Sequence, residues 1–285
     1  MAPDPKNNII ELQIDISEQM IAQNINALDI LAQASGLSKQ KLKDAMSKGA
    51  VWLSPSAKSQ NAKPLRRKHA KLKAGNQLSL YYNPQVLAQQ VDSPRLIADE
   101  GDYSVWHKPY GVWSHGSKWG DHCSIGRLVE QYFSQQQKPR QSFVVHRLDR
   151  AANGLILIAH NKKAAQALSE LFANRKVEKI YRAAVVGHFT HDQTIESPID
   201  GKTAISHAAL LEFDATANQS LLEIKIETGR KHQIRKHLSS IGFPIIGDRL
   251  YGEAKNTDSD LQLTAFELKF ACPFTGVPRQ YLSQN

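Results

Sequence analysis

Apolar residues recur along this chain at two spacings, and each spacing predicts one kind of element. Residues 155–159 are continuously apolar, which predicts a buried strand. Residues 162–172 repeat apolar side chains at helical spacing behind a potential N-cap at Asn161. Residues 221–227 alternate apolar and charged side chains, as a half-exposed antiparallel strand does. The pattern therefore predicts a mixed α/β chain with antiparallel pairing.

The same reasoning predicts that strands and short helices are interleaved along the whole chain. Strands are predicted at 51–53, 77–82, 103–106, 154–159, 179–187, 204–213, 221–227 and 263–270, and helices at 28–34, 39–46, 124–134, 162–172 and 228–241. Residues 84–95 include Pro84 and Pro94 and predict a linker. We therefore divide the chain into a small domain at 1–92 and a larger domain at 93–285.

The distribution of charge suggests a partner. The formal net charge of +9 favours a polyanion, with nucleic acid ahead of a membrane surface. Residues 1–92 hold 12 Lys and Arg against 7 Asp and Glu, and six of these cations lie within 63–73. Such a run can be a solvated loop, but together with a basic helix at 39–46 it predicts contact with a phosphate backbone. The candidate contact residues are Arg66, Arg67, Lys68 and Lys71.

Several classes of protein do not fit the sequence. The two cysteines, Cys123 and Cys272, cannot form a disulfide framework and have no zinc-ligand spacing. The chain also lacks a Gly-rich phosphate loop, a Gly-x-Ser-x-Gly elbow and a metal-ligand cluster, so we expect no metal and no cofactor. Residues 1–11 contain no apolar signal segment, and no apolar run approaches membrane-spanning length. We expect a cytoplasmic protein.

One short stretch concentrates charge at the start of a predicted core strand. In Val-His-Arg-Leu-Asp-Arg, residues 145–150, Asp149 lies between Arg147 and Arg150 just before the apolar run at 155–159. Unpaired charges at such a position are costly, which favours a functional site. An Asp that caps a turn beside surface arginines explains the local pattern equally well. His146 and His232 fit a structural role better than a catalytic one.

The N-terminal third resembles the small RNA-binding module named after ribosomal protein S-four. The likeness lies in Gly-Leu-Ser-Lys at 36–39 between two helices, Gly-Ala-Val at 49–51 before a strand, and Leu-Lys-Ala-Gly at 72–75 before the next strand. The resemblance implies that residues 1–92 bind RNA.

Further motifs, in order, resemble the RluA-type family of RNA pseudouridine synthases. They are His-Lys-Pro-Tyr-Gly-Val at 107–112, His-Arg-Leu-Asp-Arg at 146–150, Lys-Ile-Tyr-Arg-Ala-Ala-Val-Val-Gly at 179–187, Gly-Arg-Lys-His-Gln-Ile-Arg-Lys-His-Leu at 229–238 and Ile-Gly-Asp-Arg-Leu-Tyr-Gly at 246–252. The resemblance implies an α+β pseudouridine synthase fold, whose largely antiparallel central sheet is flanked by helices. It also implies a cofactor-free isomerase that acts on a uridine of ribosomal or transfer RNA, and we expect a monomer.

The resemblance assigns roles to residues that match these motifs. Asp149 matches the catalytic aspartate, which acts at the ribose either by attack on C1′ or by removal of the C2′ proton. Arg235 matches the arginine that pairs with this carboxylate and keeps it ionised. Tyr181 matches the tyrosine beside the flipped base, and Arg147 the side chain that fills the vacancy in the RNA helix. The sequence leaves both routes at the ribose open.

The remaining motif residues take supporting roles in this interpretation. Lys108 and Arg230 are expected to contact phosphates or support loops, and His146, Arg150 and His232 to support the site. The chain departs from the family at Ala152-Asn153, where a Thr-Ser pair is usual. This departure keeps a second hypothesis open, namely a catalytically idle RNA-binding or folding factor on the same scaffold.

Overall fold

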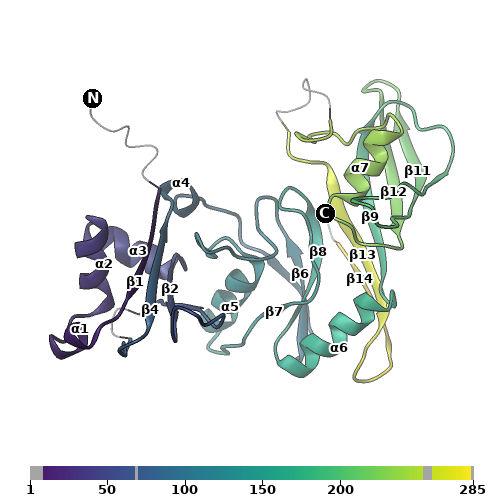
Figure 1. Ribbon diagram of the computed structural model, residues 1–285. Helices are drawn as coiled ribbons and strands as arrows, with labels where there is room; N and C mark the ends of the chain where they lie inside the picture. Colours follow the sequence, from purple (N-terminus) through teal and green to yellow (C-terminus); the bar gives the residue numbers. More distant parts are fainter. Residues whose placement is uncertain (1–8, 68–69, 253–258, 284–285) are drawn as a thin grey trace, which may run out of the picture. The chain divides into compact units, whose positions relative to one another are not determined.

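The computed structural model describes residues 9–67, 70–252 and 259–283, and the chain forms two compact units (Figure 1). The first unit comprises Met1–Gln90 and His115–Arg127, and the second comprises Val91–Ser114 and Leu128–Asn285. The domain boundary predicted at residue 92 lies close to the first point where the chain passes from one unit to the other, between Gln90 and Val91. It does not anticipate that His115–Arg127 joins the first unit.

The first unit is a four-stranded antiparallel sheet, in the order β1-β4-β2-β3, with short helices. Its elements are β1 (Ile10–Asp15), α1 (Glu18–Ala22), α2 (Ala27–Ser35), α3 (Lys39–Ser47), β2 (Val51–Ser54), β3 (Lys63–Pro64), β4 (Gln77–Tyr82) and α4 (Pro84–Leu87). Local sequence explains both main helices. Asn26 and Ser38 accept hydrogen bonds from first-turn amides, and Gly36 ends α2 in the left-handed conformation.

The second unit is built on a ten-stranded mixed sheet, in which β8 and β13 pair in parallel and the other pairs are antiparallel. The main order is β10-β11-β12-β9-β13-β8-β6-β5, with β14 paired to β13 and β7 to β8. Its strands are β5 (Arg95–Asp99), β6 (Tyr103–Lys108), β7 (Phe143–Val144), β8 (Asn153–Ala159), β9 (Glu178–Val186), β10 (Gln193–Ile195), β11 (Ser206–Asp214), β12 (Gln219–Ile226), β13 (Leu263–Ala271) and β14 (Pro278–Leu282). This architecture confirms the predicted fold class.

Helices cover the sheet over two apolar clusters. Helix α6 (Lys162–Ala173) packs on β7 and β8, where its buried Ala164 and Leu168 join the cluster that contains Leu155 and Leu157. Helix α7 (Gln233–Ser240) packs on β11, and its Ile234 joins a second cluster. The third long helix, α5 (Ile125–Gln135), spans the point where the chain passes from the first unit to the second. Strand β9 lies in the middle of the sheet order, between β12 and β13.

The predicted helix at 228–241 begins later than its amphipathic pattern suggested. The helix starts at Gln233, and His232 before it has the left-handed φ of +56°. The Gln233 side chain accepts hydrogen bonds from the Thr228 hydroxyl (2.7 Å) and the Arg230 amide (3.0 Å). Because these bonds hold residues 228–232 as a loop, the prediction of helix there was wrong.

Several elements escaped the sequence prediction. Strands β1, β10 and β14 were not predicted, and the expected linker at 84–95 contains α4 and the start of β5. Strand β5 leaves no residue fully buried, and β14 buries one of five, so neither shows a clear apolar alternation. Backbone pairing of β5 with β6 and of β14 with β13 forms these strands without an apolar pattern in their own sequences.

Candidate active site

The loop that carries Asp149 lies between β7 and β8 and is fixed by the segment that follows β6. The Ser114 hydroxyl donates to the Leu148 carbonyl (2.6 Å) and accepts from the Leu148 amide (2.9 Å). The Gly111 amide donates to the Arg150 carbonyl (2.9 Å). Both backbone neighbours of Asp149 are thus held directly, which limits the positions open to its carboxylate.

Lys108, at the end of β6, is fully buried beneath this loop. Its ammonium group donates to the carbonyls of Pro109 (3.1 Å), Val112 (3.0 Å) and Ala152 (2.6 Å). Burial lowers its pKa to about 7, although the Asp149 carboxylate acts in the opposite direction. Contact with an RNA phosphate is incompatible with this burial, so that part of our expectation was wrong. Lys108 ties the 109–112 segment to the Asp149 loop.

Replacing Lys108 with Met should change how stability depends on pH. The folded pKa of about 7 lies below the ordinary lysine value, so between pH 7 and 9 the unfolded chain binds more protons than the folded chain. This group therefore makes the free energy of unfolding rise with pH, by at most about 1.4 kcal/mol per unit. Urea unfolding of wild type and Lys108→Met at pH 7, 8 and 9 should show a flatter dependence in the variant. An identical dependence, or the same flattening in exposed Lys138→Met, would contradict the prediction.

Arg235, from the first turn of α7, makes its strongest contacts with Asp248. The guanidinium Nε and Nη2 atoms donate to the two Asp248 carboxylate oxygens at 2.8 and 2.6 Å, and both side chains are almost fully buried. Burial raises the pKa of Asp248, but Arg235 and the amides of Leu250 and Tyr251 outweigh this effect and hold it below its usual value. The pair is a bidentate, hydrogen-bonded ion pair.

The Asp149 carboxylate faces the remaining side of this arginine. One oxygen lies 3.6 Å from Arg235 Nη1, and the other lies 3.8 Å from His232 Nε2. The other ring nitrogen of His232 lies 3.0 Å from the Tyr251 hydroxyl, which orients the imidazole. The structure brings Asp149 and Arg235 together as expected, but the primary partner of Arg235 is Asp248.

Tyr181 lies on β9, between its antiparallel neighbours β12 and β13. Its backbone pairs with Ile224 on one side and Ala265 on the other, which fixes the backbone from which the ring extends. Burial, and then the negative charge of Asp149, raise the pKa of the phenol well above its ordinary value. Tyr181 is therefore a neutral hydroxyl at physiological pH.

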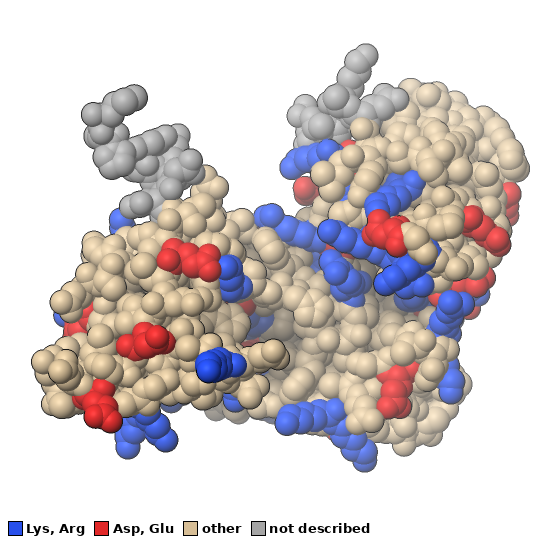
Figure 2. All heavy atoms as spheres, viewed as in Figure 1, with Lys and Arg blue, Asp and Glu red and all other residues tan. Residues whose placement is uncertain are grey.

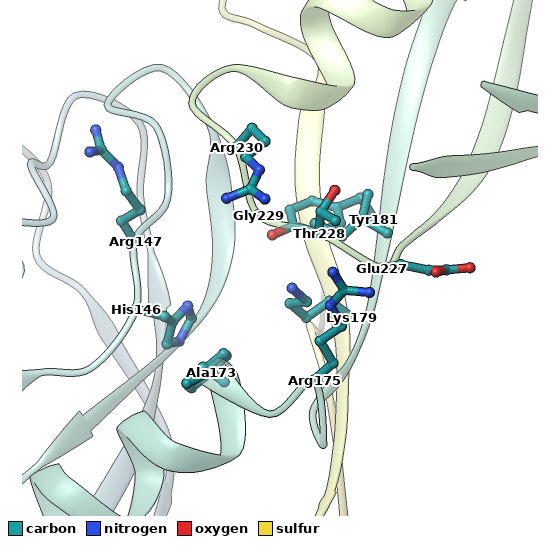
Figure 3. Close-up of a pocket in the computed structure, with 12 residues that line it drawn as sticks. His146, Arg147, Ala173, Arg175, Lys179, Tyr181, Glu227, Thr228, Gly229 and Arg230 are labelled. Carbon is teal, nitrogen blue, oxygen red and sulfur yellow. The ribbon is translucent and has the colours of Figure 1, made fainter. Parts of the chain in front are cut away.

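Two cavities that share Tyr181 adjoin these side chains, and a third, of about 440 Å³, is lined by Asp149, His232 and Arg235 on its other side. A narrow cavity of about 70 Å³ is lined by Asp149, Tyr181, Arg235 and the 229–235 segment. A wider cavity of about 420 Å³ shares Arg147, Tyr181 and Arg230 with it and extends towards the end of α6. Figure 3 shows Arg147 on one wall and Tyr181 on the opposite wall of the wider cavity, with Arg230 between them.

Several predicted residues have other surroundings. His146 accepts the Leu157 amide at Nε2 (2.9 Å) and stacks on Phe172, and burial followed by the charge of Lys179 lowers its pKa to about 3. Arg150 is exposed, donates to the Gly111 carbonyl and lies 5.2 Å from the Trp113 ring centre. Both positions are compatible with support of the loop.

The predicted RNA contacts of the first unit differ in their exposure and partners. Arg66 forms an ion pair with Asp121 inside that unit, whereas Arg67 and Lys71 are exposed. Lys68 lies outside the described residues. Figure 2 shows that Lys and Arg side chains occur on the visible surface of both units.

Sequence reasoning missed three residues that shape the site. Asp248 belongs to the 246–252 motif, but the sequence did not indicate that it pairs with Arg235. Lys179 likewise opened the 179–187 motif without an assigned role, and Ser114, two residues beyond the 107–112 motif, gave no signal, because a serine beside a motif is common on protein surfaces. At the motif departure, Ala152 fits the apolar core, while Asn153 Oδ1 is buried without a hydrogen-bond partner among the described residues.

Neither a metal-binding cluster nor a membrane-spanning helix occurs in the described part of the chain. Within residues 9–67, 70–252 and 259–283, no three His, Cys, Asp or Glu residues are grouped so that they could hold a metal ion. No helix in these ranges combines the length and the apolar character needed to cross a membrane.

Known proteins are similar to this chain in sequence. The family described as RNA pseudouridylate synthase matches residues 102–240. The chain is 35% identical to YlyB of Bacillus subtilis (strain 168), named an uncharacterized RNA pseudouridine synthase, over 67% of this chain and 68% of that one. It is 35% identical to the ribosomal large subunit pseudouridine synthase D of Pseudomonas aeruginosa over 58% of this chain and 55% of that one. Several such matches span less than two thirds of the relative's length.

A solved structure shares the fold. The human protein named RNA pseudouridylate synthase domain containing 1 superposes with a TM-score of 0.59, over 69% of this chain and 85% of that one, at 23% identity.

Proposed function

Because this chain belongs to the RluA-type family of RNA pseudouridine synthases, which are isomerases, we propose that it converts a specific uridine to pseudouridine with Asp149 as the reacting carboxylate. One observation carries the assignment. The Asp149 carboxylate, half-buried beside Arg235, lines the same narrow cavity as Tyr181. A carboxylate, a cation and a neutral phenol around one small cavity suit a reaction at a nucleoside.

The isomerisation breaks the bond between N1 of uracil and C1′ of ribose and forms a bond between C5 and C1′. A proton leaves C5 and N1 gains one, so the atoms balance without another reactant. Asp149 acts at the ribose, through attack on C1′ or removal of the C2′ proton, and both routes need a carboxylate with free lone pairs. The nearest side-chain nitrogens, Arg235 Nη1 at 3.6 Å and His232 Nε2 at 3.8 Å, lie beyond hydrogen-bond distance and leave these lone pairs available.

Arg147 and Tyr181 would handle the base. A uridine inside a helix cannot reach a cavity beside β9, so the nucleotide must leave its stack at a cost of a few kcal/mol. Tyr181 would pack against the flipped base as a neutral phenol. Arg147 is exposed on the opposite wall of the wider cavity, and we propose that it occupies the space that the base leaves.

The substrate we propose is ribosomal RNA of the large subunit. Relatives that are 25–35% identical to the chain over the aligned residues are named ribosomal large subunit pseudouridine synthase D. A uridine in a loop or an irregular helix is the most accessible target, because its base costs least to flip.

The test is a map of pseudouridines in ribosomal and transfer RNA from cells with and without the gene. We expect one or a few sites to disappear on deletion and to return with a wild-type copy. If every site survives deletion, the proposed function is wrong. Loss confined to transfer RNA would keep the reaction but overturn the proposed substrate.

We further propose that the first unit, an S-four-like module, binds RNA through Arg67 and Lys71, which are exposed. Charge reversal of both residues should weaken binding of a large-subunit RNA transcript and make the slope of log affinity against log salt shallower by about 0.7–0.9 for each phosphate that is no longer bound. Turnover on a minimal stem-loop should stay unchanged. Point variants suit this test better than deletion of residues 1–92. The deletion would remove Arg66 but leave its partner Asp121, which belongs to the same unit. An equal effect of exposed Lys58→Glu would contradict a specific role.

A further inference from the structure

The wider cavity contains a group of cations that the proposed reaction does not use. Arg175 and Lys179 line it together with Arg147 and Arg230. Glu227 also lines it, but its carboxylate binds His207 at 2.9 Å, and Figure 3 shows it pointing away from the other side chains. The cavity therefore presents positive charge to whatever occupies it.

Arg175 occupies a backbone position that normally selects glycine. Helix α6 ends at Ala173 with Asn174 as C-cap, and the next residue, Arg175, has the left-handed φ of +55°. The amides of Arg175 and Lys176 donate back to the carbonyls of Phe172 (3.2 Å) and Leu171 (2.8 Å), which is the Schellman pattern. A side chain at this position strains the backbone. An arginine at this position, with its side chain lining the cavity, suggests a role for that side chain.

Lys179 provides the second charge from the start of β9. Its side chain is half-buried, its Nζ points towards Gly229 across the cavity, and no carboxylate of the described residues forms an ion pair with it. Burial and the positive charge of Arg175 both lower its pKa. Two neighbouring cations without an acid between them are stabilised by an anion.

We propose that Arg175 and Lys179 bind a backbone phosphate of the nucleotide next to the target uridine, an inference that rests on the proposed function. The wider cavity shares Arg147, Tyr181 and Arg230 with the cavity that contains Asp149, so an RNA chain that enters one continues into the other. Arg provides paired donors that match phosphate oxygens, and Lys adds a compact charge.

The experiment compares wild type with Arg175→Gly and Lys179→Gln, using an unmodified transcript of large-subunit ribosomal RNA as the probe. Each variant should bind about tenfold more weakly, as expected when one charge-assisted hydrogen bond is removed. The slope of log affinity against log salt should become shallower by about 0.7–0.9. KM should rise with kcat unchanged, because a phosphate bound away from the reacting atoms contributes uniform binding.

Two controls separate this role from structure. Glycine is favoured at the left-handed position, so Arg175→Gly should melt at the wild-type temperature or above it. Lys176→Gln removes an exposed charge one residue away, outside the cavity, and should leave binding and salt slope unchanged. Wild-type affinity and slope in both cavity variants would overturn the proposal, as would an equal loss of affinity in Lys176→Gln.

The two proposals fail in different ways. If wild type forms no pseudouridine in any RNA, the proposed function is wrong, while the binding measurements still test the phosphate site. If wild type is active and both cavity variants bind like wild type, the phosphate site is wrong and the function stands.

Discussion

Asp149→Asn is expected to abolish pseudouridine formation while leaving the fold and RNA affinity almost intact. An amide neither attacks C1′ nor accepts the C2′ proton, so kcat should fall by at least about 10⁴-fold, as when other enzymes lose the residue that performs the chemical step. The fold should tolerate the change because Asn has nearly the same shape. Arg235 also retains its two hydrogen bonds to Asp248.

The measurement is single-turnover pseudouridine formation with saturating enzyme, together with thermal melting and RNA affinity. Asp200→Asn is the matched control, because Asp200 is an exposed carboxylate in the same unit and pairs with Lys236. It should retain wild-type turnover. Residual turnover of Asp149→Asn near the wild-type rate would exclude Asp149 as the reacting group.

The same variant addresses the idle-scaffold hypothesis in cells. If Asp149→Asn restores growth of a deletion strain without restoring pseudouridine, the cellular role lies in RNA binding. If the variant restores neither growth nor pseudouridine, the cellular role depends on catalysis. The buried Arg235–Asp248 pair beside Asp149 favours the second outcome, because such a pair is expensive to maintain without a use.

Sequence reasoning succeeded where the cause of a structure is local. Asn161 caps α6 through the Ala164 amide, and Gly36 ends α2, because both effects act within four residues. The alternating pattern of β12 was equally readable, since one face of that strand is buried. These elements follow from neighbouring residues alone.

Sequence reasoning failed where a residue's partner comes from elsewhere in the fold. Lys108 has a charge that predicts exposure, yet three carbonyls from two loops bury it. Residues 228–232 continue an amphipathic pattern, but the Gln233 side chain and the His232 contact with Tyr251 hold them as a loop. Neither the burial of Lys108 nor the loop at 228–232 can be predicted from the spacing of apolar residues along the sequence.

The Asp149 site shows the same division. The resemblance pointed to Asp149, Tyr181 and Arg235 through motifs far apart in the sequence, and in the structure these three side chains line one cavity. The motifs did not identify Asp248 as the residue that positions Arg235, because that pairing depends on how the 246–252 turn packs against α7. The geometry assigns to Arg235 a fixed orientation with Nη1 left facing Asp149.

This division of partners predicts a large effect for Asp248→Asn. The substitution leaves the Arg235 charge buried with Asp149 as its remaining anion at 3.6 Å, so the free energy of unfolding should fall by about 3–5 kcal/mol. Turnover should also fall, because Arg235 is no longer held in its orientation. The stability difference from wild type should shrink below about pH 4, where the Asp248 contribution is lost as the pH falls through its lowered folded pKa.

The double variant Arg235→Met/Asp248→Asn separates stability from catalysis. Removing the arginine also removes the buried, poorly compensated charge, so urea unfolding should show that the double variant recovers at least about 1–2 kcal/mol over Asp248→Asn. Turnover should not recover, because Asp149 then has no guanidinium beside it. If stability and turnover recover together, Arg235 acts through the fold alone. If the double variant is as unstable as the sum of both single variants, the two side chains are not coupled and the Arg235–Asp248 pair does not position the site.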